Sequence, residues 1–365
     1  MGATTGEVRR LWPRLVIVLA VLGSAHVYIG WRLFAPLPAP WSLVGALAIA
    51  LLTPSLPLSA ILARRTSRSA ARPYLLVAYL WFALATYLLL GAAGSHVAVA
   101  AGADPRIAAL VGIGGAIAVV LGGLAHVARG PRVRRVEIPL ARLPVASYSI
   151  VQLSDVHVGP LLGREFVAGV VSQVNALDPD LIVITGDLID GRLDELRPHV
   201  EPLRGLRARD GVYCVTGNHE YYWSAEAWLV HLRSLGIQPL RNQRVTIAGT
   251  LELAGVDDDT AREDIPAAVA GRDPVLPLVL LAHHPRAITR AVAAGVDLQL
   301  SGHTHGGQLL PLGWLARLFD PQVAGLGRFG ATWLYVNEGT GFWGPPVRVG
   351  TTQEITAITL VPSTT

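Results

Sequence analysis

The chain has few charged residues, a single cysteine and no lysine. Only 15% of its 365 residues are charged, and all 30 basic residues are arginine. Its single cysteine, Cys214, excludes an intramolecular disulfide and a cluster of thiolate metal ligands. Soluble domains carry about 25% charged residues, whereas 52% of this chain is hydrophobic. The composition therefore indicates a membrane-embedded portion.

Four apolar stretches are long enough to cross a bilayer, since about 20 residues of helix span its hydrocarbon core. They cover residues 15–34, 43–63, 74–93 and 107–127. The first has the basic flank of a secretory signal, but it lacks a convincing cleavage site and three further spans follow it. We therefore predict a multi-pass protein of the cell membrane, anchored by about four transmembrane helices within residues 1–135.

Arginine clusters predict the orientation of this anchor. They lie before the first span, between the second and third spans and after the fourth, whereas the other two loops hold few. Basic residues at span ends favour the cytoplasmic side, so both termini and the domain that follows are expected in the cytoplasm. The clusters also explain the net charge of +4. Membrane lipids are thus expected partners, and nucleic acid is not.

Residues 136–365 alternate short strands with helical segments. The strand candidates are YSIVQL, DLIVIT, GVYCVT, LELAGV, PLVLLA, DLQLS, TWLYVN and ITAITLV. Several are almost wholly apolar, which suits a sheet that is covered on both faces. With helices between the early strands, the pattern predicts one α/β domain.

Metal-capable side chains follow several of these strands. They are Asp155, His157, Asp187, Asn218, His283, His303 and His305. The carboxyl ends of strands are where open α/β sheets bind ligands. Carboxylate, amide and imidazole ligands without sulfur suit divalent Mn, Fe, Zn or Mg. Two ions that share one carboxylate would use all seven, and such a pair can hold a bridging hydroxide and clamp a phosphoryl group.

The ligand pairs in DVH and HTH are expected on extended backbone. Alternate residues of an extended chain point to the same side, so Asp155 would lie beside His157, and His303 beside His305. Each motif taken alone also fits a surface turn. Their occurrence in order, each at a strand end, favours a common site.

The blocks SDVHVG, GDLID, GNHEYY, HHP and GHTHGGQ resemble, in this order, those of the calcineurin-like metallophosphoesterases. The ending VNEGTGFWGPPVRVGTTQEI resembles that of a membrane-anchored bacterial branch that also carries GHTHGGQ. The resemblance implies a four-layer α/β/β/α sandwich and a metal-dependent phosphoric ester hydrolase.

The resemblance also implies roles for single residues. One ion would be bound by Asp155, His157 and His305, the other by Asn218, His283 and His303, and Asp187 would bridge them. His284 is the alternative to His283. His219 would act with Asp187 in catalysis, by hydrogen-bonding the phosphoryl group or protonating the leaving oxygen, and Glu220 would orient His219.

The expected reaction is hydrolysis of a phosphodiester or pyrophosphate by a metal-bridging hydroxide. The membrane anchor suggests a lipid-linked substrate, although a soluble phosphate-containing small molecule also fits. The apolar segment 309–330 could contact the membrane or an acyl chain, or could pack as a cap on the domain. The alternative function is a non-catalytic membrane scaffold or transporter whose phosphoesterase-like domain binds a metal or another ligand.

Overall fold

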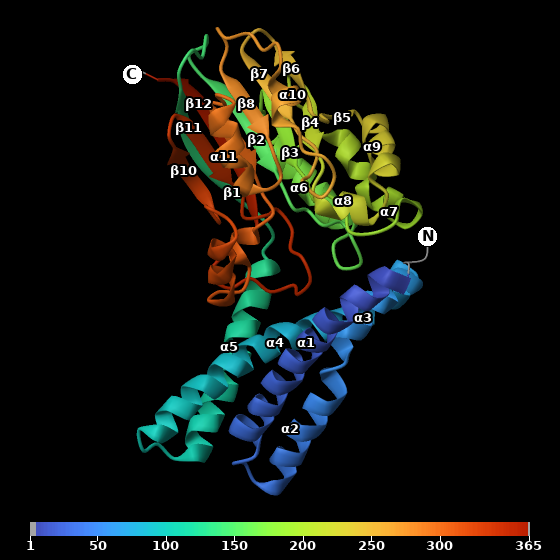
Figure 1. The fold of residues 1–365 in the computed structure, drawn as a ribbon, viewed down its shortest axis with the longest axis vertical. Coiled ribbons are helices and arrows are strands. Elements are labelled where there is room, and N and C mark those ends of the chain that lie inside the picture. Colours follow the sequence, from blue (N-terminus) through green and yellow to red (C-terminus); the bar gives the residue numbers. More distant parts are fainter. Residues whose placement is uncertain (1–4, 364–365) are drawn as a thin grey trace. The chain divides into compact units, whose positions relative to one another are not determined.

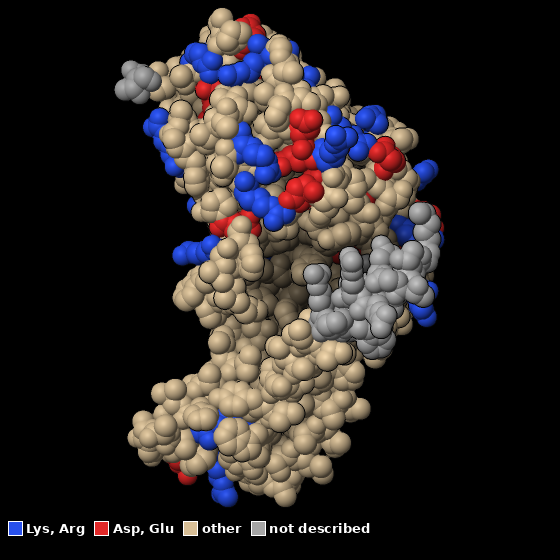
Figure 2. Space-filling model, in the orientation of Figure 1, with Lys and Arg blue, Asp and Glu red and all other residues tan. Residues whose placement is uncertain are grey.

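A computed structural model describes residues 5–363 of the chain, apart from the side chains of residues 5–15, 60, 63 and 64 (Figure 1). It divides the chain into two compact units, Met1–Leu124 and Ala125–Thr365. The division falls within the last apolar helix, before the boundary at residue 135 that we expected. On the face shown in Figure 2, most charged side chains belong to the second unit, and the described part of the first unit is mostly uncharged.

The first unit contains the four predicted membrane helices. The segments long and apolar enough to cross a bilayer are Val16–Phe34, Ala39–Ser59, Arg68–Ala100 and Pro105–Val127. The first combines α1 (Thr5–Ile29) with a π-helical turn, η1 (Gly30–Phe34), and the second combines α2 (Ala39–Leu52) with the start of α3 (Ser55–Arg65). The third is α4 (Arg68–Ala100) and the fourth is α5 (Pro105–Val127).

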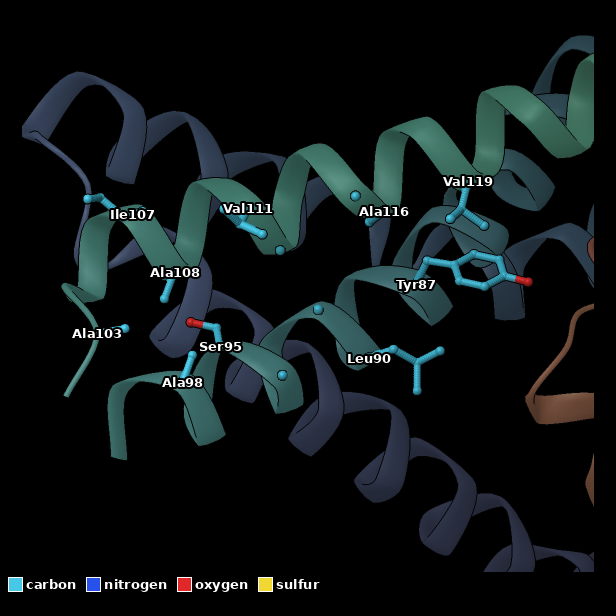
Figure 3. A pocket seen from close by; sticks show the side chains of 14 residues that line it. Tyr87, Leu90, Ser95, Ala98, Ala103, Ile107, Ala108, Val111, Ala116 and Val119 are labelled. Atoms are coloured by element: carbon cyan, nitrogen blue, oxygen red, sulfur yellow. The ribbon is translucent and has the colours of Figure 1, made fainter. Parts of the chain in front are cut away.

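Two of these spans differ in detail from the prediction. The second is interrupted before α3, where Pro54 occupies the N-cap, because proline cannot donate the backbone hydrogen bond that a continuous helix needs. Helix α4 extends beyond the predicted 74–93 at both ends. A cavity of about 490 Å³ lies between α4 and α5 (Figure 3), lined by residues such as Tyr87, Ser95 and Val111.

The second unit contains two six-stranded sheets. In spatial order the first sheet is β1 (Arg132–Leu140), β12 (Glu354–Pro362), β2 (Tyr148–Leu153), β3 (Leu181–Thr185), β4 (Val212–Val215) and β5 (Ile237–Pro239). The second sheet is β10 (Gly325–Phe329), β11 (Thr332–Val336), β9 (Leu298–Ser301), β8 (Leu278–Leu281), β7 (Leu251–Gly255) and β6 (Gln243–Ile247). Strands β2 to β5 run parallel, as do β7, β8, β9 and β11.

Helices cover the outer face of each sheet. The first sheet packs against α6 (Arg164–Asn175), α7 (Leu193–Val200) and α9 (Ala225–Ser234), and the second against α10 (Ile265–Val269) and α11 (Ile288–Ala293). In β3, Ile182 and Ile184 face the helices, whereas Leu181 and Val183 join the core between the sheets. Since successive side chains of a strand point to opposite faces, burial on both sides explains the unbroken apolar strands. The predicted four-layer α/β/β/α sandwich is confirmed.

Candidate metal centre

The backbone of the candidate ligands is left-handed rather than extended. The φ angle is 50° at Asp155, 49° at His157, 50° at Asp187, 70° at His303 and 51° at His305. The prediction of extended DVH and HTH segments is therefore wrong. Residues other than glycine rarely adopt this conformation, and those that do are concentrated at functional sites. The turns after β2, β3 and β9 therefore position these side chains. The alternation of side chains along an extended strand does not.

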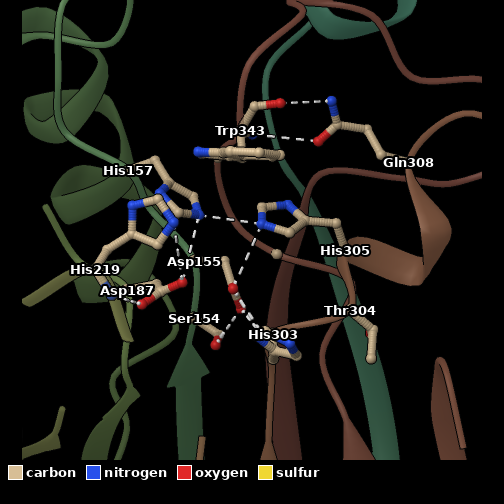
Figure 4. A network of polar contacts seen from close by, with 12 residues as sticks. Ser154, Asp155, His157, Asp187, His219, His303, Thr304, His305, Gln308 and Trp343 are labelled. Carbon is tan, nitrogen blue, oxygen red and sulfur yellow. Dashed lines mark hydrogen bonds and ion pairs between the residues drawn. The ribbon is translucent and has the colours of Figure 1, made fainter. Parts of the chain in front are cut away.

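Asp155, His157 and His305 form the first group of ligand atoms, all within 4.8 Å of one another. His305 Nε2 lies 3.1 Å from His157 Nε2 and 3.4 Å from Asp155 Oδ1 (Figure 4). The Ser154 hydroxyl and the His303 backbone N–H both donate to the Asp155 carboxylate. The Asp155 carboxylate is therefore held in place by two hydrogen bonds, one from Ser154 and one from His303.

Asp187, His283 and His303 form the second group. His283 Nδ1 lies 2.7 Å from the carbonyl oxygen of Thr185, and because a carbonyl can only accept, Nδ1 carries a proton and Nε2 is the nitrogen that can bind a second proton or a metal ion. That Nε2 lies 3.3 Å from Asp187 Oδ2 and 3.3 Å from His303 Nδ1. A ring nitrogen and a carboxylate oxygen at this distance are held together by a positive charge, which either a proton on Nε2 or a metal ion can supply.

The electrostatics of this second group favour a cation. Burial opposes protonation of His283, but the carboxylates of Asp187, Asp155 and Asp258 together outweigh it and raise the pKa of this histidine well above its usual range. Burial likewise opposes ionisation of Asp187, and His283, His157 and His219 together outweigh it, which lowers the pKa of the carboxyl well below its usual range. A proton and a metal ion compete for the same nitrogen, so the point that attracts the extra proton is also suited to a metal ion.

Asp187 lies between the two groups. Its Oδ2 atom is 3.3 Å from His283 Nε2 and 3.9 Å from His157 Nε2, so one oxygen faces both. Its Oδ1 atom accepts a hydrogen bond from the His219 backbone N–H. A carboxylate in this position can contact ions in both groups.

Asn218 begins helix α8 (Asn218–Tyr222) and supplies an amide. Its Nδ2 donates to the Tyr222 hydroxyl over 3.2 Å, whereas its buried Oδ1 has no hydrogen-bond partner. A buried carbonyl without a partner is unfavourable, and a metal ion would satisfy it. Carboxylate, imidazole and amide donors without sulfur fit a divalent ion of the hard to borderline class.

His219 is oriented by Asp190 and not, as predicted, by Glu220. His219 Nδ1 lies 3.2 Å from Asp190 Oδ1, whereas the Glu220 carboxylate accepts backbone N–H groups of Gly217, Asp187 and Leu188. Burial alone would lower the pKa of His219, but the bond with Asp190 and the nearby carboxylates raise it to about 9. Asp190 is the second aspartate of GDLID, so the motif itself contained the signal.

The structure places His283, not His284, against Asp187. His284 Nε2 instead lies 3.1 Å from Asp258 Oδ2 and 3.4 Å from Asp259 Oδ1. The two adjacent histidines of HHP therefore point to different carboxylates.

Two further residues of the site were missed by the sequence analysis. Arg348 is 1% exposed and donates to the backbone carbonyls of His305, Gly339 and Gly341. Burial, with His157 and Arg348, lowers the pKa of His305 well below its usual range, which keeps this imidazole neutral. Trp343, half exposed, lies over His219 with ring centroids 5.9 Å apart. Both come from the ending that resembles the membrane-anchored branch, but nothing in their spacing predicts these contacts.

Gln308, the last residue of GHTHGGQ, holds Trp343 in place. Its side chain donates to the carbonyl of Trp343 over 2.9 Å and accepts from its N–H over 3.2 Å (Figure 4). The indole at the mouth of the site is thereby tied to the turn that carries His303 and His305.

Known proteins share this domain. A family model described as calcineurin-like phosphoesterase matches residues 148–307. A transmembrane protein with metallophosphoesterase domain from Bos taurus is 44% identical over 261 residues, which are 65% of this chain and 59% of that protein. An uncharacterized metallophosphoesterase from Aquifex aeolicus is 33% identical, with 67% of this chain and 97% of that protein covered. One from Helicobacter pylori is 37% identical, with 64% of each covered. The match thus spans about three fifths of the bovine protein.

Proposed function

The chain belongs to the calcineurin-like metallophosphoesterase family, and we propose that it is a metal-dependent phosphoesterase that hydrolyses a phosphodiester or pyrophosphate of a lipid-linked substrate. In this proposal it is a member of the membrane-anchored bacterial branch. Two divalent ions, of Mn, Fe, Zn or Mg, would be held by the seven residues above, with Asp187 between them.

One observation carries the proposal. His283 Nε2, the ring nitrogen that does not donate to Thr185, faces a carboxylate oxygen and a second ring nitrogen, each at 3.3 Å. Within reach of the same Asp187 oxygen lies the first group, in which His157 and His305 approach to 3.1 Å through their Nε2 atoms. Two clusters of this kind that share one carboxylate suit a pair of ions better than one ion.

The ions would act as Lewis acids that lower the pKa of a water nucleophile and neutralise charge on the phosphoryl oxygens. The protein's own contribution is to fix the ligands and to hold a proton. His219 has its Nδ1 at Asp190 and its Nε2 4.0 Å from Asp187 Oδ2. Its raised pKa keeps the ring protonated near neutral pH, so Nε2 can donate to the leaving oxygen as a general acid.

An exposed apolar segment beside the site supports a lipid-linked substrate. The 3-10 helix η5 (Leu312–Leu318) follows the GHTHGGQ turn and buries none of its residues. With three residues per turn, Leu312, Leu315 and Leu318 lie in one row, exposed by 44%, 54% and 74%. Phe319, the residue after this helix, is also exposed. Exposed apolar surface of this kind marks contact with a membrane or an apolar ligand.

A polar cavity lies next to this helix. It has a volume of about 460 Å³ and is lined by residues including Gly306, Arg317, Gln322 and Glu338. Ligand cavities commonly have volumes of about 300–1,000 Å³. Its lining carries one basic side chain, Arg317, and two carboxylates, Asp320 and Glu338, so its charge does not favour a phosphate group.

We further propose that the domain faces the cytoplasm, and the support is the arginine bias of the three segments on that side of the spans. A scaffold or transporter remains the alternative to an enzyme with a lipid substrate. No charged side chain is among the described residues that line the cavity between α4 and α5, so it offers no ion pathway of the usual kind.

The test uses the full chain in detergent, loaded with Mn²⁺. Asp187→Asn should remove at least one bound ion and the hydrolysis of bis-p-nitrophenyl phosphate, whereas His219→Ala should keep the metal content and lower turnover by about 100-fold or more. Full activity of the Asp187→Asn protein would refute the proposed site. Hydrolysis of bis-p-nitrophenyl phosphate but not of CDP-diacylglycerol would refute the lipid-linked pyrophosphate and leave the phosphodiesterase.

A further inference from the structure

A third group of metal-capable side chains lies outside the seven proposed ligands. It consists of Asp258, Asp259 and His284, whose ligand atoms all lie within 4.8 Å of one another. His284 Nε2 is 3.1 Å from Asp258 Oδ2 and 3.4 Å from Asp259 Oδ1. We propose that these three residues bind a third divalent cation, beside the pair and independent of the phosphoesterase reaction.

Each carboxylate of this group has one oxygen engaged by the protein and one turned to His284. Asp258 Oδ1 accepts the backbone N–H of Thr260 over 2.9 Å, whereas its Oδ2 is buried and has no hydrogen-bond partner. Asp259 Oδ2 pairs with Arg286, and its Oδ1 is the oxygen near His284. The two remaining oxygens are therefore oriented by contacts that a bound ion would leave intact.

His284 lacks the hydrogen bonds that a buried imidazole normally makes. Its side chain is 9% exposed, and both ring nitrogens are buried without a hydrogen-bond partner. Nε2 and Asp258 Oδ2 are close but misaligned for a hydrogen bond. Leaving such atoms unsatisfied is unfavourable, and one cation would satisfy the nitrogen and both oxygens together.

A third carboxylate, from a different part of the chain, points to the same conclusion. Asp320 follows η5, is 9% exposed, and its Oδ1 is also buried without a partner. Burial raises the pKa of Asp320, while His284 and Arg286 act to lower it, so this carboxylate lies within electrostatic reach of the group. Three carboxylates against the single guanidinium of Arg286 leave excess negative charge for a divalent ion.

The donor set defines the class of ion. Two carboxylate oxygens and one imidazole nitrogen suit Mn²⁺, Zn²⁺ or Fe²⁺ better than a soft, thiolate-seeking ion. The His284 ring lies 3.8 Å from the His303 ring and 5.2 Å from the His283 ring, measured between centroids. A third ion would therefore adjoin the ligands of the proposed second ion without using any of them.

The experiment counts ions per chain. The full protein in detergent is stripped with EDTA, equilibrated with Mn²⁺, freed of excess metal, and analysed by inductively coupled plasma mass spectrometry. We expect three ions in the wild type, and one fewer in Asp258→Asn, Asp259→Asn and His284→Ala. The matched control is Asp257→Asn, because Asp257 is adjacent and buried but pairs with Arg241 over 2.8 Å, and it should keep three.

The outcomes separate this site from the proposed pair. If all three variants bind as many ions as the wild type, the third site is overturned, whatever the proposed pair binds. If Asp187→Asn lowers the count while Asp258→Asn lowers it further in the double variant, both sites stand. If Asp258→Asn removes the only ion bound, the third site stands and the pair fails. Should Asp258→Asn unfold in metal-free buffer, Asp259→Asn decides, since that carboxylate is 24% exposed.

Discussion

His219 and Asp190 form a hydrogen-bonded pair at the edge of the candidate metal centre, with Nδ1 and Oδ1 3.2 Å apart. The Trp223 indole N–H donates to the same Asp190 oxygen over 3.1 Å, which holds the carboxylate in place. Since Nδ1 is directed at Asp190, Nε2 is the nitrogen left to face a substrate. A histidine held in this way has a defined proton-donating atom.

The first prediction concerns the pH dependence of turnover. A general acid must be protonated, so turnover falls as the pH rises through the pKa of His219, which Asp190 helps to raise to about 9. Asp190→Asn removes that carboxylate and lowers the pKa, so the fall in kcat should move to lower pH. Once the pH exceeds the pKa of the ring, the protonated fraction falls about tenfold with each further pH unit. The measurement is kcat against pH for the metal-loaded wild type and variant.

The control for this change is Asp194→Asn, since Asp194 is an exposed aspartate of the same region that pairs with Arg192. Its pH profile should match that of the wild type. Coincident profiles for wild type and Asp190→Asn, at equal metal content, would contradict the assignment of His219 as the acid.

The second prediction concerns the first glycine of GHTHGG. A Cβ atom on Gly302 would lie 1.8 Å from Ser154 Oγ and 2.2 Å from Asp155 Oδ2. Gly302→Ala must therefore displace the carboxylate of a proposed ligand, and we expect loss of at least one metal ion and of hydrolysis. Gly169→Ala is the control, because a Cβ there meets nothing within 4 Å in helix α6. That change should stabilise the fold by about 0.5–1 kcal/mol. Unchanged metal binding in Gly302→Ala would show that Asp155 is not a ligand.

The third prediction concerns Arg348 beneath His305. The guanidinium donates to three backbone carbonyls and lies 3.3 Å from His305 Nδ1. Lysine cannot reproduce this planar set of donors, so Arg348→Lys should loosen His305 and weaken metal binding by about 10-fold to 100-fold, as is usual when a residue supporting a ligand is lost. Competition with a chelating dye measures this change. Arg328→Lys, at an exposed arginine over Trp333, should leave the affinity unaltered.

Local patterns predicted the α/β domain and the ligand types, whereas the four layers were implied by the family resemblance. Strands such as LIVIT are apolar throughout because both faces are buried, and the residues that follow them lie at one sheet edge. The left-handed backbone at Asp155 and His303 could not be predicted from the sequence. A positive φ is usually indicated by glycine, and neither residue is a glycine. The contacts of Arg348 could not be predicted either. Its partners are backbone carbonyls, which every residue has and which therefore leave no pattern in the sequence.

The fourth prediction separates lipid binding from catalysis. Leu315 and Leu318 lie on η5 with 54% and 74% of their surface exposed and contribute no ligand to the metal centre. If they contact the acyl portion of a substrate, burying each contributes about 1.5–3 kcal/mol. The double change Leu315→Ser and Leu318→Ser should then lower kcat/KM for CDP-diacylglycerol by at least about tenfold. Hydrolysis of bis-p-nitrophenyl phosphate, which has no acyl chain, should stay within a factor of about two.

Val230→Ser, at an exposed valine on α9, should affect neither substrate. An equal loss on both substrates would mean that η5 supports the fold of the site, and no loss on either would remove this helix from substrate binding.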